Sequence, residues 1–133
     1  MTATTTRMTA AESDVPSLGE LLVQSAVGVR ARTAVQALVE EETLLTLDNV
    51  RAALVTKRDG AMTCRWEGMA GRLYTLGLDT SDRTFLGLVL SIVGVQQSYL
   101  AAVEHLDERR LKIVLKAILR LADNDRIAIG IRL

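Results

Sequence analysis

Aromatic residues are scarce in this sequence, where Trp, Tyr and Phe together make up only 3% of 133 residues. The core must therefore be built from aliphatic side chains. A surface that stacks on nucleic-acid bases is disfavoured, because stacking requires aromatic rings. A charge excess is also missing, since 16 basic residues balance 16 acidic ones. This balance argues against phosphate neutralisation, so nucleic acid is not the favoured partner.

Cysteine and histidine each occur once, as Cys64 and His105. One cysteine excludes an intramolecular disulfide and is typical of a reducing compartment. Two such residues are also too few for a His/Cys metal site. The amino-terminal residues lack the charged and apolar regions of a signal peptide. We therefore expect a cytoplasmic protein with no metal or other cofactor, and the sequence indicates no small-molecule ligand.

Catalytic motifs are missing as well, because the chain contains no G-x-S-x-G, P-loop or glycine-rich dinucleotide motif. His105 follows Glu104 at an expected helix end, where a solvent-facing histidine is commoner than a general base. Cys64 has no base beside it in the sequence. We expect a protein that is not an enzyme. A catalytic site shared between subunits would require His105 or Cys64 to lie in a cleft.

The chain has the length of one domain, and 49% of its residues are hydrophobic. Residues 1–16 are rich in Thr and Ala without apolar periodicity, which predicts a mobile tail. Residues 17–133 are expected to form a single helical domain. The expected fold is mostly α, a bundle of four to five helices with a C-terminal β-strand in a small sheet or an intersubunit ribbon. An α+β fold is the alternative.

The first expected helix runs from Leu18 to Glu42. Ser17 and Glu20 form a capping box at its start, and Gly28 predicts a bend or break in its middle. Residues 40–42 are three glutamates, interpreted as a solvated helix end. Consecutive side chains point in different directions around a helix, so these carboxylates are not expected to share a metal.

Residues 46–67 allow two interpretations. Asp59-Gly60 is a strong signal for a two-residue hairpin turn, which would pair Thr56 with Thr63. Alternatively, a helix begins near Asp48 and ends at Gly60; this second interpretation is the preferred one. A glycine-loosened helix is expected from Trp66 to Leu76.

Residues 84–103 form a run of twenty without a formal charge. The run is long enough to span a membrane, but Gln96 and Gln97 would lie inside the hydrocarbon, so a buried core helix is expected instead. Four small residues at helical spacing would form one edge for close backbone packing, either within the chain or between subunits. This candidate self-association edge consists of Gly87, Ser91, Gly94 and Ser98.

The pattern after Asp107 predicts an amphipathic helix with acidic residues at its start and Arg120 near its end. Its expected buried stripe consists of Leu111, Val114, Leu115, Ile118 and Leu121. A basic line on another side, which is a solvated face or a set of phosphate contacts, consists of Arg109, Lys112, Lys116 and Arg120.

Apolar residues alternate at the end of the sequence, which predicts a half-buried strand. The candidate strand-pairing residues are Ile127, Ile129, Ile131 and Leu133. A buried strand needs a partner for its backbone groups. The candidates are the Asp59-Gly60 hairpin, a strand near residues 43–47, or the same strand of another subunit.

Two functional hypotheses follow. The favoured one is a non-enzymatic interaction or structural module that self-associates, most simply as a homodimer. The alternative is a small helix-turn-helix DNA-binding regulator, in which residues 66–76 would form the reading helix.

Overall fold

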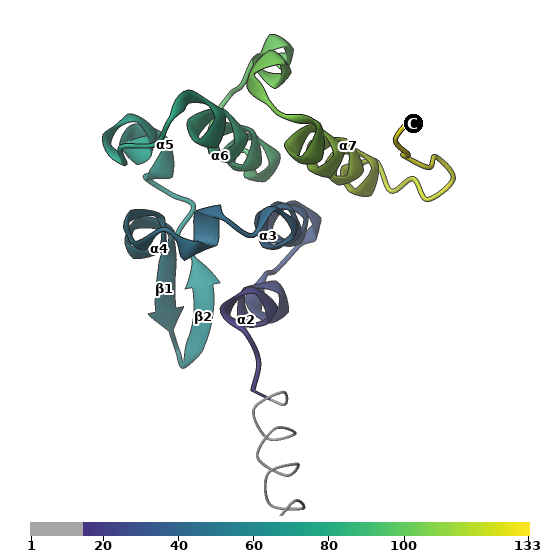
Figure 1. Cartoon of the computed structure of the whole chain (residues 1–133). Coiled ribbons are helices and arrows are strands. Elements are labelled where there is room, and N and C mark those ends of the chain that lie inside the picture. Colours follow the sequence, from purple (N-terminus) through teal and green to yellow (C-terminus); the bar gives the residue numbers. More distant parts are fainter. Residues whose placement is uncertain (1–14) are drawn as a thin grey trace, which may run out of the picture.

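The computed structural model describes residues 15–133, which are mostly helical with one small antiparallel sheet. The residues drawn in Figure 1 as a thin trace, 1–14, lie outside the described part, and so does most of the expected mobile tail. The main helices are α2 (Leu18–Ser25), α3 (Val29–Glu41), α4 (Asp48–Leu54), α5 (Met69–Arg72), α6 (Thr80–Val93) and α7 (Glu108–Leu121). Short 3₁₀ helices are η1 (Leu44–Thr46), η2 (Leu73–Thr75) and η3 (Leu100–His105), and the strands are β1 (Val55–Arg58) and β2 (Ala61–Cys64).

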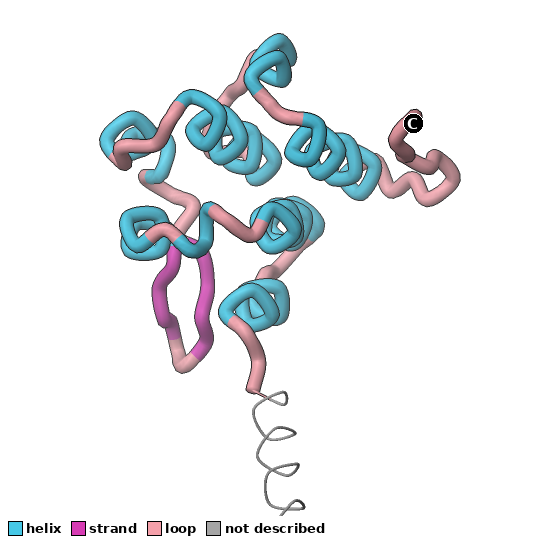
Figure 2. The backbone as a smooth tube through the Cα atoms, in the orientation of Figure 1, coloured by secondary structure: helices cyan, strands magenta, loops and turns pink. Residues whose placement is uncertain are grey.

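Helix α3 lies at the centre of the fold. It packs against α2 on one side and against α6 and α7 on the other, and α2 also contacts β2 (Figures 1 and 2). The buried hydrophobic side chains of this core are aliphatic, apart from Phe85 and the thioether of Met69. The buried cluster includes Ala34, Ala37, Leu38, Leu44, Val50, Leu54, Leu73, Leu86, Val89, Leu90, Ile113 and Val114.

The expected first helix is divided in two, as the glycine predicted. The Ser17 hydroxyl accepts a hydrogen bond from the Glu20 amide at 3.2 Å and caps α2. Gly28 then has a φ of +92°, a conformation open to glycine and strained for other residues, and α3 begins at the next residue.

Residues 46–67 contain a helix followed by a hairpin, so the preferred interpretation of a helix up to Gly60 is wrong. Helix α4 ends at Leu54, and Asp59 and Gly60 both adopt positive φ in a tight turn. Thr56 pairs with Thr63, the register that the turn predicted. The Asp-Gly turn and the β-branched residues beside it outweigh the helical pattern here.

The expected helix from Trp66 to Leu76 is much shorter than predicted. Gly68 has a φ of +81°, so α5 can begin only at Met69, and it covers four residues before the chain tightens into η2. The reading helix of the DNA-binding hypothesis, expected over residues 66–76, is therefore reduced to residues 69–75, of which the last three are 3₁₀.

The twenty-residue uncharged run does not form one helix. Helix α6 starts at Thr80, before the uncharged run, with Asp79 as its cap, and ends at Gly94, whose φ is +95°. The amides of Gly94 and Val95 both donate to the carbonyl of Leu90, which closes the helix. At 14 residues α6 is about 21 Å long, well short of a hydrocarbon layer of about 30 Å. Among residues 15–133, every helix is too short or too polar to cross a bilayer.

Helix α7 begins as predicted, with the Asp107 carboxylate accepting from the Arg110 amide at 2.7 Å. Its burial is rotated from the predicted stripe, because α7 packs mainly on α3 and leaves a second apolar flank uncovered. The buried positions are Arg110, Ile113, Val114 and Ala117, whereas Leu115, Ile118 and Leu121 are exposed.

The last residues do not form the predicted strand within the described chain. Residues 126–133 have no regular secondary structure, and they lie beyond α7, away from the hairpin (Figure 1). Residues 44–46, another candidate partner, form the 3₁₀ helix η1. An intrachain partner for the 126–133 segment is therefore lacking across residues 15–133.

Candidate self-association surface

Exposed apolar side chains concentrate on α7 and on the segment after it. Among the described residues 15–133, twelve large hydrophobic side chains are exposed, and six of them lie within residues 115–133. We call this set the apolar C-terminal region: Leu115, Ile118, Leu121, Ile127, Ile131 and Leu133. Ile118 is 46% exposed and Ile127 is 57% exposed, although both are large aliphatic residues. Clustered exposed apolar residues mark interaction sites more often than isolated ones do.

The 126–133 segment has an internal symmetry that suits pairing with a copy of itself. Residues 126–132 read R-I-A-I-G-I-R, which is nearly the same in both directions about Ile129. In an antiparallel pair centred on Ile129, Ile127 of one chain would lie opposite Ile131 of the other. All isoleucines would then share one face, because side chains alternate along a strand. A two-fold symmetric interface requires such self-complementarity.

The candidate edge of small residues is not a straight helical edge, and that part of the prediction is wrong. Gly94 ends α6 and Ser98 lies in the loop after it, where the chain turns back. The Ser98 hydroxyl donates to the Gly87 carbonyl at 3.2 Å. A methyl group at Gly87 would lie 3.0 Å from the side chain of Gln96. The space beside Gly87 is therefore occupied by the loop that follows α6 in the same chain. Ser91, one turn further along α6, is half-buried.

Two of the four residues of the basic line are held by carboxylates. Arg120 donates to Glu40 at 2.5 Å, and Arg109 donates to Glu41 at 2.9 Å. The remaining two, Lys112 and Lys116, are half-buried on α7. Because half of the line is neutralised within the chain, the geometry supports phosphate contacts less than the sequence pattern did.

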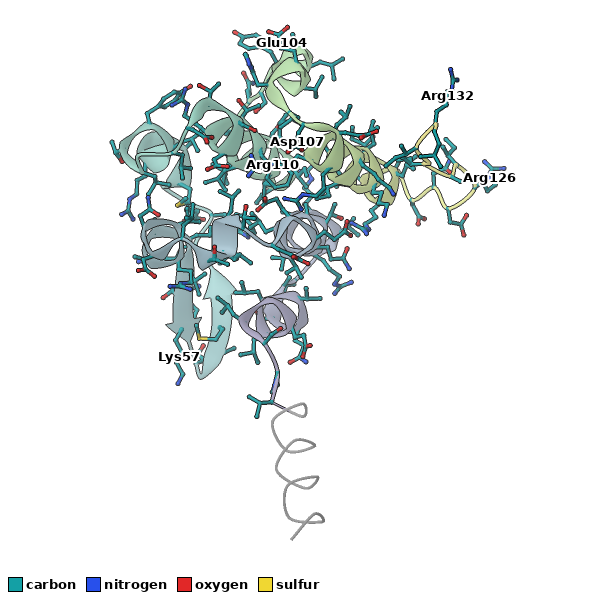
Figure 3. The ribbon with its side chains drawn as sticks, in the orientation of Figure 1. Lys57, Glu104, Asp107, Arg110, Arg126 and Arg132 are labelled. Carbon is teal, nitrogen blue, oxygen red and sulfur yellow. The ribbon has the colours of Figure 1, made fainter. Side chains whose placement is uncertain are left out.

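A buried ionic cluster joins the ends of α3, α6 and α7. The Glu41 side chain is 0% exposed and accepts from the Thr43 hydroxyl, the Leu44 amide and both Arg109 and Arg110, at 2.5–3.3 Å. Arg110, labelled between these helices in Figure 3, also donates to Asp82 at 2.5 Å and to the Ser81 hydroxyl at 2.9 Å.

The cluster keeps both of its central groups charged. Burial raises the pKa of Glu41, but hydrogen bonds from Thr43, Leu44 and Arg110 outweigh burial, and the pKa lies below the ordinary value of 4.5. Burial by itself would lower the pKa of Arg110. The hydrogen bonds from Arg110 to Asp82 and Glu41 outweigh this effect, so the pKa of Arg110 lies above its ordinary value. With its charges paired and its hydrogen bonds made, the cluster fixes helix positions and offers no free base.

The sequence interpretation of residues 40–42 as a solvated helix end is wrong for Glu41. A usable signal was present, because Glu41 follows Ala34 by seven residues and Leu38 by three, which places it on the buried face of α3. The partner arginines lie almost seventy positions away, and no local pattern identifies them.

The two residues considered for catalysis lie on different elements, His105 on η3 and Cys64 on β2. The His105 Nε2 lies 3.6 Å from the Glu104 carboxylate in an exposed pair on η3, the short helix where Figure 3 labels Glu104. Burial raises the pKa of the Cys64 thiol to about 12, which keeps it protonated at neutral pH. Within the part of the chain that the structure describes, no group of three metal-ligating side chains converges.

No family model matches this chain, and neither the curated proteins nor the solved structures contain a significant match.

Proposed function

We propose that this protein is a non-enzymatic interaction module that self-associates as a dimer through its apolar C-terminal region. One observation carries the proposal. The 126–133 segment has the alternation of a strand and a self-complementary sequence, yet it is exposed except for the half-buried Ile129 and has no strand partner among residues 15–133. A second copy of the chain supplies the matching partner.

The flank of α7 contributes to the same interface. An isolated two-stranded ribbon is only marginally stable in water, so the paired segments need an apolar surface to pack on. Leu115, Ile118 and Leu121 offer that surface on the helix that immediately precedes the segment. Pairing and packing together would remove the isoleucine face from water, at roughly 25 cal/mol for each Å² of apolar area buried.

Charge placement gives this dimer a characteristic salt dependence. In the symmetric register, Arg126 of one chain lies opposite Arg132 of the other, and like charges across a strand pair are destabilising. Figure 3 shows both arginines on the segment beyond α7. Added salt screens this repulsion and should strengthen the dimer, whereas binding to nucleic acid would weaken with salt.

The test is the mass of the particle in solution. Sedimentation equilibrium at micromolar concentration should give twice the chain mass of 14.5 kDa for the wild type. Ile127→Asp should give the monomer mass, because the charge would be buried opposite Ile131 of the partner. Ala128→Asp is the matched control, since it adds the same charge one position away on the other face, and it should remain dimeric.

Circular dichroism should show the same helix content for all three proteins, because Ile127 is largely exposed in the single chain. Deleting residues 125–133 should also give monomers. A monomeric wild type at micromolar concentration would refute the proposal, and so would an Ile127→Asp variant as dimeric as Ala128→Asp.

A further inference from the structure

A cleft of about 460 Å³ lies between the hairpin and the end of α6. Its volume falls within the range of small-molecule sites, roughly 300–1,000 Å³. Three chain segments line it, namely β1, the end of β2 with the residues after it, and the residues on either side of Gly94. The lining residues are Thr56, Arg58, Thr63, Cys64, Arg65, Trp66, Glu67, Val93 and Val95.

Part of the lining is apolar. Cys64, Trp66, Val93 and Val95 are half-buried and pack against the hydrophobic core, so the core supports them from behind. The thiol of Cys64 stays neutral because burial raises its pKa to about 12. Trp66 supplies the one indole ring of the chain, a flat surface for an apolar or aromatic ligand.

The polar part of the lining carries a net positive charge. Arg58 and Arg65 are exposed there with one carboxylate, Glu67. The ion pairs formed within residues 15–133 include neither arginine. Arg65 donates from Nη2 to the Ala52 carbonyl at 3.1 Å, which orients its guanidinium and leaves its other N–H groups available. Thr56 and Thr63, paired across the hairpin, add two hydroxyl groups.

We propose that this cleft binds a small organic anion that has an apolar or aromatic body. The body would lie against Trp66, Val93 and Val95, and the anionic group would be held by Arg58 with support from Arg65. A guanidinium suits a carboxylate or sulfonate because its N–H groups match two acceptor oxygens. The larger cleft of about 590 Å³ beside Gln96 and Tyr99 is lined without a charged side chain, so it lacks this complementarity.

The site is independent of the proposed dimer, because none of its lining residues belongs to the apolar C-terminal region. Its test therefore uses the Ile127→Asp protein as well as the wild type. Failure of one proposal leaves the other unaffected.

The experiment uses 8-anilinonaphthalene-1-sulfonate, which joins an aromatic body to an anionic group. Energy transfer from Trp66 to the bound probe reports binding near the cleft, since the chain has one tryptophan. Transfer should saturate at one probe per chain in both proteins. N-phenyl-1-naphthylamine, the uncharged counterpart, should bind more weakly.

Arg58→Gln should weaken probe binding about tenfold, the usual effect of losing a charge-assisted hydrogen bond, and Arg58→Glu should weaken it further. Lys57→Gln is the matched control, because it removes a charge from the neighbouring position on the same strand (Figure 3), and Lys57 is not among the residues that line the cleft. It should bind like the wild type. Transfer that does not saturate, or equal binding by the Arg58→Gln and Lys57→Gln proteins, would overturn the proposal.

Discussion

Glu41→Gln tests whether the buried ionic cluster holds the three helix ends together. The substitution keeps the size of the side chain and one carbonyl acceptor, and it removes the negative charge. In the wild type this carboxylate is 0% exposed and faces Arg110, whose side chain is only 8% exposed. After the change, the Arg110 guanidinium would remain buried with Asp82 as its one charged partner.

The structure sets the size of the expected loss. Removing one partner of a buried ion pair lowers the free energy of unfolding by about 3–5 kcal/mol, because the other charge stays buried without its partner. Asp82 still compensates part of the Arg110 charge, and Arg109 is half-exposed and can turn to water. We therefore expect Glu41→Gln to lower the free energy of unfolding by about 3 kcal/mol, the lower limit of this range. This loss is equivalent to a fall of roughly 10 °C in Tm.

Glu40→Gln is the matched control. It is the same chemical change one residue earlier, in a pair with Arg120 in which both side chains are about one third exposed. Water and salt screen such a pair, so the loss should be at most about 1 kcal/mol. Urea unfolding followed by circular dichroism measures both variants against the wild type. If Glu41→Gln proves no less stable than Glu40→Gln, the cluster does not have the role argued for it.

Three further predictions concern pH, the thiol and the end of α6. The pKa of Glu41 is depressed by folding, so its stabilisation is complete above its unfolded value of about 4.5 and is lost as pH falls through the folded value. The stability gap between the wild type and Glu41→Gln in urea unfolding should therefore be constant near neutral pH and should narrow below about pH 4.5. The thiol of Cys64 has a pKa of about 12, so little of it is the reactive thiolate at pH 8. In the folded protein it should react with a thiol-specific disulfide reagent roughly a thousandfold more slowly than in the urea-unfolded chain. Equal rates in the two states would contradict the assigned burial. Gly94→Ala should lower the free energy of unfolding by about 1 kcal/mol because φ is +95° there, whereas Gly71→Ala, within α5 and with open space around it, should be neutral or slightly stabilising.

Local signals in the sequence predicted the helix boundaries well where a specific cap was present. Ser17 caps α2 through the hydrogen bond expected of it, α7 begins directly after Asp107 as the acidic start predicted, and Gly28 breaks the first helical region. The Asp59-Gly60 turn was also correctly recognised as a hairpin signal, with the right register, although the helical alternative was preferred. These features depend on a few neighbouring residues, which is why sequence alone is sufficient for them.

The central run from residue 84 to 103 shows where local reasoning failed. Uniform apolar character suggested one long helix, but Gly94 adopts a left-handed conformation and the following loop returns over Gly87. Glycine within a helical pattern is compatible with either continuation or termination. Here the helix ends, and the residues after Gly94 turn back so that Gln96 and Ser98 pack onto α6. The local sequence pattern does not predict this contact.

The sequence by itself determined a mostly helical chain with an aliphatic core, balanced charge, defined helix caps and a strand-like, self-complementary segment at residues 126–132. Tertiary structure decided which faces are covered. It buried Glu41 with Arg110, left Leu115 and Ile118 exposed, and brought the hairpin beside the end of α6 to form a cleft with Trp66. The reason is physical: caps and periodicity act over a few residues, whereas burial depends on which distant elements meet. The candidate functions arise from those distant contacts and from residues 126–133, which have no strand partner among residues 15–133.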